Sequence, residues 1–210
     1  MSNHSVTIKA AEHGPYIVEQ LKNLNNRKGS IECKETMALC RCGASSNKPF
    51  CDGSHARIGF SSENQLDPAL DKLENYQGKK ITLHDNRSIC AHAGYCTEAL
   101  PSVFRQHDEP FVNAEAASWQ EIMDVVDKCP SGALSYSIED DDPTPVALDA
   151  SVFIAPNGPY VIKGQAELIE ISRGEGASPK STTLCRCGAS KNKPFCDGSH
   201  WQIEFKDDDN

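Results

Sequence analysis

A block of sixteen residues occurs twice in this chain with a single difference. Residues 40–55 read CRCGASSNKPFCDGSH and residues 185–200 read CRCGASKNKPFCDGSH, so that only Ser46 and Lys191 differ. Each block places three cysteines and one histidine in the spacing C-x-C-x8-C-x3-H. Soft thiolates joined by an imidazole form a ligand set for Zn²⁺, Cu(I) or an iron–sulfur cluster. The fold must therefore bring four such ligands together in two places.

The ten cysteines fall into three groups of three, and Cys33 is left over. A chain that works in a reducing compartment uses many cysteines for metal binding or redox chemistry rather than for disulfides. The fixed spacing within the groups predicts ligand sets, whereas Cys33 has Ser178 as its counterpart and is expected to be a plain thiol. The groups are Cys40, Cys42 and Cys51; Cys90, Cys96 and Cys129; and Cys185, Cys187 and Cys196.

Composition argues against two classes of partner. The 210 residues carry a formal net charge of −9, and an acidic chain lacks the clustered basic residues that bind nucleic acid. No apolar run approaches the roughly 20 residues of a membrane span. The first ten residues, MSNHSVTIKA, contain neither an apolar core nor an Arg-rich amphipathic pattern. We therefore expect a cytoplasmic protein that contacts neither nucleic acid nor membrane.

The duplication extends beyond the cysteine blocks. Residues 14–16 (Gly-Pro-Tyr) match residues 158–160, and about fifty residues are repeated at each end of the chain. Two copies of one small domain can pack with pseudo-two-fold symmetry, as identical subunits do. Each copy is expected to be rich in strands, with Asp52 or Asp197 as the N-cap of one helical turn. The predicted strands lie at residues 6–8, 152–154, 160–162 and 168–171.

The stretch between the copies has another pattern. Residues 118–121 (Ser-Trp-Gln-Glu) form a capping box that opens a helix, which is predicted to end at Cys129 and Pro130. Short strands are predicted at residues 80–84, 111–113 and 133–136. The apolar side of the helix is predicted to consist of Trp119, Ile122, Met123 and Val126. The acidic run Glu139–Pro145 is predicted to be a linker to the second copy.

Two interpretations of each block compete on spacing alone. The first is a structural Zn²⁺ with a tetrahedral shell of three cysteines and one histidine. The second is a two-iron cluster in which the ligands divide into two pairs. Zinc sites usually begin with C-x2-C, and the tighter C-x-C of both blocks argues mildly against two ligands on one zinc ion.

Both blocks also carry a longer pattern, C-x-C-x2-S-x3-P-x-C-D-G-S-H, with Ser45 and Pro49 or Ser190 and Pro194 at the fixed positions. This pattern resembles the CDGSH (NEET, mitoNEET-like) iron–sulfur family. The resemblance implies a [2Fe-2S] cluster with one exposed histidine ligand in each copy. It assigns an inner iron to Cys40 and Cys42 or Cys185 and Cys187, and an outer iron to Cys51 and His55 or Cys196 and His200.

Two lysines lie close to these ligands in sequence. Lys48 and Lys193 occupy the same place in the two blocks. Each is expected to donate a charge-assisted hydrogen bond to the cluster, to guide an acidic partner, or to be a solvated surface lysine.

The middle group of cysteines resembles a small single-cluster bacterial ferredoxin. Cys90, Cys96 and Cys129 match its first, third and fourth ligands, and Pro130 follows the last one. Its second position is Ala93, which cannot coordinate a metal. Three thiolates suit a [3Fe-4S] cluster. The alternative is a [4Fe-4S] cluster whose fourth iron binds water, a substrate or His92.

These features predict an α+β protein with three domains. Two small β-rich CDGSH domains, residues 1–75 and 143–210, are expected in pseudo-two-fold packing, with a ferredoxin-like domain at residues 76–142 inserted between them. Family members with one copy resemble homodimers, so that two copies in one chain predict a monomer with an internal pseudo-dimer.

The sequence predicts a redox function and no enzyme. It contains no Ser/His/Asp set, no P-loop and no GxGxxG. The first hypothesis is a carrier of single electrons. The second is a protein that stores, transfers or repairs iron–sulfur clusters and gives its labile histidine-ligated clusters to apo-proteins. A third is an enzyme that uses an open middle cluster as a Lewis acid. The acidic surface predicts partners with basic docking patches.

Overall fold

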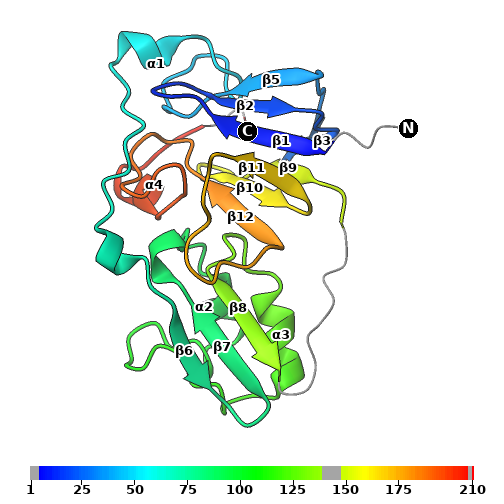
Figure 1. Ribbon diagram of the computed structural model, residues 1–210, viewed down its shortest axis with the longest axis vertical. Coiled ribbons are helices and arrows are strands. Elements are labelled where there is room, and N and C mark those ends of the chain that lie inside the picture. Colours follow the sequence, from blue (N-terminus) through cyan, green and yellow to red (C-terminus); the bar gives the residue numbers. More distant parts are fainter. Residues whose placement is uncertain (1–4, 139–147, 208–209) are drawn as a thin grey trace.

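The computed structural model of the chain describes residues 5–138, 148–207 and 210, and within them the fold is mixed α and β with more sheet than helix. Figure 1 shows the first copy at the top, the second copy in the middle and the central unit at the bottom. The predicted linker Glu139–Pro145 lies outside the described residues. Among the helices of the described part, none is long and apolar enough to cross a membrane.

The two copies exchange strands. The first copy contributes β1 (Val6–Ala10), β2 (Tyr16–Glu19), β3 (Asn23–Asn26), β4 (Gly29–Ile31) and β5 (Thr36–Leu39). The second contributes β9 (Ser151–Ile154), β10 (Tyr160–Lys163), β11 (Ala166–Ile169) and β12 (Ser181–Leu184). The sheets have the strand orders β11-β1-β2-β5 and β12-β10-β9-β3-β4.

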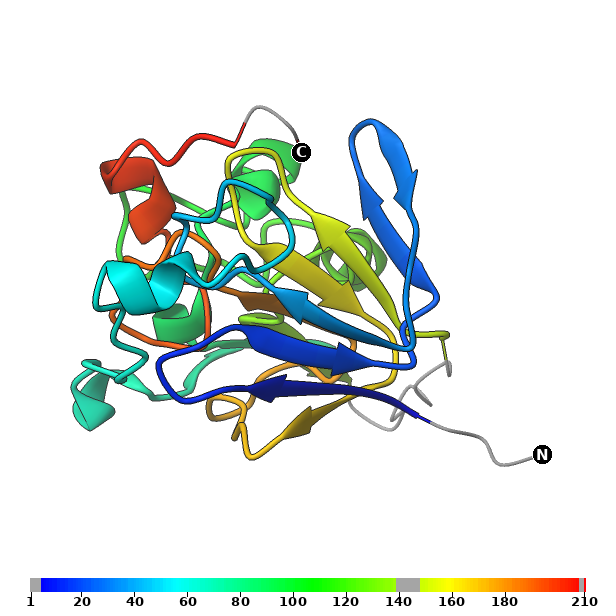
Figure 2. The same cartoon turned by 90° about the horizontal axis from the view of Figure 1, so that it is seen from above.

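The exchange is reciprocal. Strand β11 pairs in parallel with β1, with Leu168 opposite Ile8, and strand β3 pairs in parallel with β9, with Leu24 opposite Val152. Figure 2 shows the β3–β4 hairpin of the first copy beside the strands of the second. Because each copy completes the sheet of the other, neither sheet is built from one copy alone.

One hydrophobic core lies between the two sheets. Its buried residues come from both copies, and the ring of Tyr16 meets that of Tyr160 edge to face at 6.1 Å and 86°. Alternate residues of each strand point into the core, as a two-layer packing requires. The apolar members from the strands are Ile8, Val18, Leu24, Met37, Leu39, Val152, Ile154, Ile162 and Leu184.

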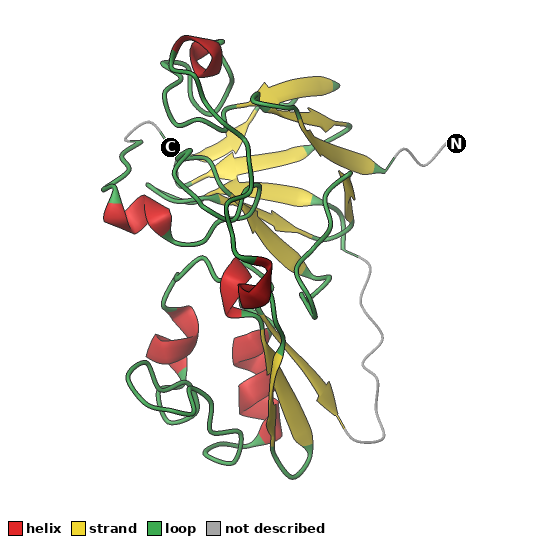
Figure 3. Cartoon of the chain, turned by 60° about the vertical axis from the view of Figure 1, so that its left-hand side comes forward, coloured by secondary structure: helices red, strands yellow, loops and turns green. Residues whose placement is uncertain are grey.

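The central unit has its own sheet and core. Strands β6 (Glu74–Gln77), β7 (Ile81–Asp85) and β8 (Leu134–Ile138) form an antiparallel sheet, against which α3 (Trp119–Val126) packs. Figure 3 shows this pairing of helices with a small sheet, in contrast to the upper part, where strands and loops dominate and the helices are single short turns. The remaining short helices are α1 (Ser54–Arg57), α2 (Tyr95–Ala99), α4 (Ser199–Gln202) and two 3₁₀ turns, η1 (Pro68–Leu70) and η2 (Arg87–Ile89).

Most predicted elements appear, with two differences in the central unit. The capping box is present, since Ser118 and Glu121 bond to each other's backbone N–H groups. The predicted strand at residues 111–113 is a single bridge between Val112 and Phe104, because Pro110 offers no N–H and no longer strand lies alongside. Helix α3 ends at Val126, three residues before the predicted Cys129.

Candidate metal centres

In each repeated block the four candidate ligands form two close pairs. The Sγ atoms of Cys40 and Cys42 are 3.8 Å apart, and Sγ of Cys51 lies 3.3 Å from Nδ1 of His55. The second copy repeats these pairs, at 3.6 Å for Cys185 and Cys187 and at 3.4 Å for Cys196 and His200. Two sulfur ligands at about 2.3 Å from one tetrahedral metal lie roughly 3.8 Å apart. Each pair is therefore spaced like two ligands of one ion.

The pairs do not merge into larger groups. Across residues 5–138, 148–207 and 210, no three side chains of cysteine, histidine, aspartate or glutamate converge as ligands of a single ion. A structural zinc site needs four ligands around one point. The described part of each block thus shows two separate ligand pairs and no single group of four ligands.

A carboxylate organises each ligand loop. Hydrogen bonds from the Ser54 side chain and from the backbone N–H groups of Ser46 and Ser54 hold the pKa of Asp52 well below its usual range. The helical turn begins at Ser54, after Gly53 in a left-handed conformation, so the prediction of Asp52 as N-cap is one residue early. Asp197 makes the same two backbone contacts in the second copy.

Each copy supports the ligand loop of the other through a buried tyrosine. The hydroxyl of Tyr16 donates to the carbonyls of Cys185 at 2.8 Å and Pro194 at 2.9 Å. The hydroxyl of Tyr160 donates to the carbonyl of Cys40 at 2.9 Å. Burial raises the pKa of both phenols, which therefore stay protonated and able to donate. The two metal centres are thus linked through backbone that carries their first cysteines.

The arginine inside each C-R-C motif is buried, but only one has a carboxylate partner. Arg186 forms an ion pair with Asp207 and donates to the carbonyl of Gly158 at 2.7 Å. Arg41 donates to the carbonyl of Ala11 at 3.3 Å, and its Nε has no hydrogen-bond partner among the described residues. Sequence reasoning missed both arginines, although their position between two ligands was a signal.

The two lysines of the blocks brace the ligand loops. Nζ of Lys48 donates to the carbonyl of Ser45 and Nζ of Lys193 to that of Ser190, both at 2.6 Å. Lys193 is buried, so the alternative of a solvated surface lysine is wrong for that residue.

The surroundings of the two outer histidines differ. His55 is half-buried, whereas His200 is 4% exposed and burial lowers its pKa. The ring of Trp201 lies 5.0 Å from that of His200. On the other side, His92 of the central unit fits against Gly198 so closely that a Cβ there would lie 2.6 Å from the imidazole. The second centre is therefore enclosed by the central unit.

In the central unit the three predicted cysteines share one cavity. Cys90, Cys96 and Cys129 line it together with Ala93, the residue at the place of the missing ligand. Burial, followed by the neighbouring Cys90 and Cys129, raises the pKa of Cys96 to about 11. Thiols whose ionisation is disfavoured, as that of Cys96 is, become stable thiolates when metal cations replace their protons. The donor set thus fits an iron–sulfur cluster.

His92 does not line this cavity, and Cys33 lies in neither block. His92 is exposed and faces Gly198, and it lines a neighbouring pocket with Cys90 and Cys96 but is absent from the cavity that all three cysteines share. The Sγ of Cys33 contacts the carbonyl of Ile31 at 3.7 Å, as expected of a plain thiol.

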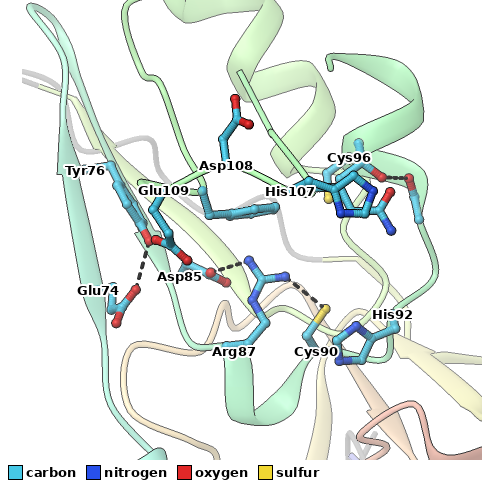
Figure 4. Close-up of a pocket in the computed structure, with 14 residues that line it drawn as sticks. Glu74, Tyr76, Asp85, Arg87, Cys90, His92, Cys96, His107, Asp108 and Glu109 are labelled. Atoms are coloured by element: carbon cyan, nitrogen blue, oxygen red, sulfur yellow. Dashed lines mark hydrogen bonds and ion pairs between the residues drawn. The ribbon is translucent and has the colours of Figure 1, made fainter. Parts of the chain in front are cut away.

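An ion pair between the buried carboxylate of Asp85 and the exposed guanidinium of Arg87 reaches this centre, as Figure 4 shows. The Arg87 guanidinium pairs with Asp85 at 2.5 Å, lies 4.0 Å from the centre of the Phe111 ring, and donates to Sγ of Cys90 at 3.7 Å. Burial raises the pKa of Asp85, whose Oδ1 has no partner among the described residues. Sequence reasoning missed this pair, because nothing in the spacing of Asp85 and Arg87 marks them.

The comparisons with known proteins cover the regions that contain these sites. Residues 13–56 and 157–201 match the family of the iron-binding zinc finger of CDGSH type, and residues 76–139 match the divergent 4Fe-4S mono-cluster family. The central region is 34% identical over 61 residues to the uncharacterized protein YjdI of Escherichia coli strain K12, and equally to that of strain O157:H7. This match covers 29% of the chain and 80% of either relative. No solved structure matches the chain.

Proposed function

The chain belongs to the CDGSH iron–sulfur family, with a divergent mono-cluster ferredoxin-like domain between its two copies, and we propose that it carries single electrons through three iron–sulfur centres. The observation that carries this proposal is the closeness of the central centre to the second copy. The loop after Cys90 places His92 against Gly198, two residues before His200. Redox centres that lie close together can pass an electron from one to the other within the chain.

We assign a [2Fe-2S] cluster to each block. Cys40 and Cys42 would hold one iron and Cys51 and His55 the other, with the equivalent residues of the second copy acting in the same way. The pair spacings of 3.3–3.8 Å support this division. A neutral imidazole in place of a thiolate leaves less negative charge around a cluster, which makes it easier to reduce.

For the central site we propose a [3Fe-4S] cluster held by Cys90, Cys96 and Cys129. The methyl group of Ala93 in the same cavity supports three ligands rather than four. A [4Fe-4S] cluster with a non-protein ligand remains the alternative, and it agrees with the description of the matched family.

We further propose that the two copies form an internal pseudo-dimer and that the chain is a monomer. The reciprocal pairing of β11 with β1 and of β3 with β9 supports this arrangement. The crossed tyrosine hydrogen bonds from Tyr16 and Tyr160 support it as well. An interface satisfied inside one chain leaves no equivalent surface for a second copy.

The remaining expectations follow from the same proposal. We place the protein in the cytoplasm, without membrane or nucleic-acid contact, and assign it no enzymatic activity of its own. Its partners would be redox proteins with basic docking patches, because the net charge of −9 steers positively charged surfaces toward it.

One observation favours cluster transfer as a second function. His55 is half-buried and has Ala56 beside it, whereas His200 is enclosed by Trp201 and His92. An accessible histidine ligand is open to protonation, and a protonated imidazole cannot bind iron. The first copy is therefore the better candidate for a cluster that is passed to apo-proteins.

A single experiment separates the two functions. The holo-protein is mixed with an apo-ferredoxin, and cluster transfer is followed by absorbance in oxidised and in reduced samples. A carrier is reduced rapidly by a ferredoxin or flavin reductase and transfers no cluster. Transfer within minutes, with slow reduction, contradicts the carrier and supports the donor.

A further inference from the structure

A cavity of about 410 Å³ lies where the outer face of the second sheet meets α4 and the cluster loops of the central unit. Strands β12, β10 and β9 contribute Thr183, Val161 and Phe153, which are direct cross-strand neighbours. The central unit contributes Ala93 and Pro130. No cysteine lines the cavity, so it is separate from the spaces between the ligands. Its volume lies within the range of small-molecule sites.

Thr183, which lines the cavity, carries a buried hydroxyl without a hydrogen-bond partner among the described residues. Thr183 is 1% exposed, and its Oγ1 forms no hydrogen bond within the described part of the chain. Buried polar groups in folded proteins are nearly always hydrogen-bonded, and each exception needs an explanation. A ligand with a ring oxygen or nitrogen would supply the missing bond.

Two exposed aromatic side chains border the same cavity. Trp201 is 61% exposed and Phe153 is 40% exposed. Exposed aromatic groups around a cavity are typical of ligand sites, and aromatic rings prefer to stack on other flat rings. The indole of Trp201 also lies 5.0 Å from the ring of His200, an outer ligand of the second centre. A flat ring against Trp201 would therefore sit close to that centre.

The charge of the lining favours an anion. Lys163 lines the cavity, and no aspartate or glutamate does. The whole chain is acidic, with a net charge of −9, so a cavity with only a basic charged residue is a local exception. Such a site attracts an anionic group and disfavours a cation.

The first copy has none of these features. The positions equivalent to Phe153, Lys163, Thr183 and Trp201 are Lys9, Glu19, Ala38 and Ala56. The ligand sequences of the copies are nearly identical, but the four residues that give the cavity its character all differ. The difference thus concerns this cavity rather than the metal site.

We propose that this cavity binds an anionic, planar aromatic carrier of two electrons, of the chemical class of flavin mononucleotide. The ring would stack on Trp201, a ring heteroatom would bond to Thr183, and the phosphate would face Lys163. The proposal deepens the electron-carrier function and rests on it. The cavity has the second centre on one side, at His200, and the central centre on the other, at Ala93.

The position of the cavity between two metal centres matches the number of electrons that a reduced flavin gives up. A reduced flavin that is oxidised gives up two electrons and two protons. One electron would go to the centre of Cys196 and His200 and the other to the centre of Cys90, Cys96 and Cys129, and both protons would go to water. Two adjacent one-electron acceptors therefore match one two-electron donor.

The test is a calorimetric titration of the holo-protein with flavin mononucleotide, and in parallel with riboflavin, which lacks the phosphate. We expect one flavin mononucleotide per chain. Thr183→Val and Trp201→Ala should each weaken its binding by about tenfold, the effect of one lost hydrogen bond or stacking contact. Lys163→Glu, which introduces the residue of the first copy, should weaken the binding of flavin mononucleotide but not that of riboflavin.

Matched variants of the first copy, Ala38→Val and Ala56→Gly, should leave the affinity unchanged. Thermal unfolding gives a second readout, because replacing an unpartnered hydroxyl by a methyl group should leave Thr183→Val as stable as the parent protein. Absence of binding, or equal binding to the parent and to the double variant of Thr183 and Trp201, overturns the proposal. Binding without electron transfer to the clusters leaves the site standing and contradicts the carrier function instead.

Discussion

The two copies of the ligand block differ in one residue but lie in different surroundings. The second is enclosed by the central unit, with His200 4% exposed and Arg186 neutralised by Asp207. In the first, His55 is half-buried and Arg41 has a buried Nε without a partner among the described residues. The two blocks thus share their candidate ligands and differ in their surroundings, and we propose that the stability, access and potential of each centre depend on residues outside the motif. Four predictions test this difference, from the largest expected effect to the smallest.

The largest effect concerns the buried ion pair of the second copy. Asp207→Ala leaves the charge of Arg186 buried without its partner, which should lower the free energy of unfolding by about 3–5 kcal/mol. Ser62 occupies the equivalent position in the first copy and bears no charge. Ser62→Ala should lower the same free energy by less than about 1 kcal/mol. Urea unfolding of the two holo-variants measures this, and equal losses would contradict the comparison.

The crossed tyrosines give the next effect. Tyr16→Phe removes the bonds to the carbonyls of Cys185 and Pro194, and the loss should destabilise that loop by about 1–3 kcal/mol. Cluster loss from the second copy should therefore accelerate in Tyr16→Phe, and from the first copy in Tyr160→Phe. Loss to a chelator is followed by absorbance.

To assign that loss to a copy, one centre is removed. Replacing both cysteines of one C-R-C motif by serine leaves a single CDGSH centre to be observed. The hydrogen bonds indicate that each tyrosine stabilises the centre of the other copy. An effect of each tyrosine variant on the centre of its own copy alone would contradict this coupling.

Acid should release the two clusters in order. Protonation of a histidine ligand near its unperturbed pKa of about 6.5 favours loss of the outer iron. Burial lowers the pKa of His200, so this imidazole stays neutral and able to bind iron at a lower pH. We expect the first copy to lose its cluster at a higher pH than the second, as two phases after a pH jump.

Cysteine replacements identify these phases. His55→Cys should slow the phase at higher pH, and His200→Cys the phase at lower pH, because a thiolate is retained where the imidazole would be protonated. A pH profile that is unchanged in the double variant contradicts the role of the histidines.

The smallest effect is on reduction potential. An uncompensated cation near a cluster stabilises the reduced form of that cluster. Arg41→Gln should therefore lower the reduction potential of the first centre by roughly 40 mV, which corresponds to about 1 kcal/mol for one electron. Arg41→Lys keeps the positive charge and should therefore shift the reduction potential less than Arg41→Gln does. In the second copy, Arg186→Gln together with Asp207→Asn removes both charges and should leave the potential close to that of the parent. Shifts of equal size in both copies would contradict the electrostatic difference.

The sequence offered candidate ligands and told little about their surroundings. Cys40, Cys42, Cys51 and His55 stand close together in the chain, so the motif and its resemblance to the CDGSH family predicted a pairing that spacing alone left open. The capping box at Ser118 was equally local. The exchange of β3 and β11, in contrast, depends on contacts between residues more than a hundred positions apart, and no local pattern records which sheet a short strand joins.

Long-range contacts also explain what sequence reasoning missed at the sites. The partner of Arg186 is Asp207, which lies beyond the ligand block in the sequence. No spacing within the motif predicts this pair, because the fold alone brings the two side chains together. The pair of Asp85 and Arg87 became a feature of the central site only when the fold brought it to Cys90. Ala93 was predicted to stand in place of a missing ligand, and the structure places it in the lining of the cavity of the three cysteines and of the cavity beside the second sheet.

The most direct test of the account combines metal analysis with redox titration monitored by electron paramagnetic resonance. The account predicts about seven irons and eight sulfides per chain, with no stoichiometric zinc. It predicts three one-electron centres, of which the second copy and the central unit interact magnetically while the first copy does not. Zinc in the two blocks, or fewer than three one-electron centres, would contradict a three-centre electron carrier.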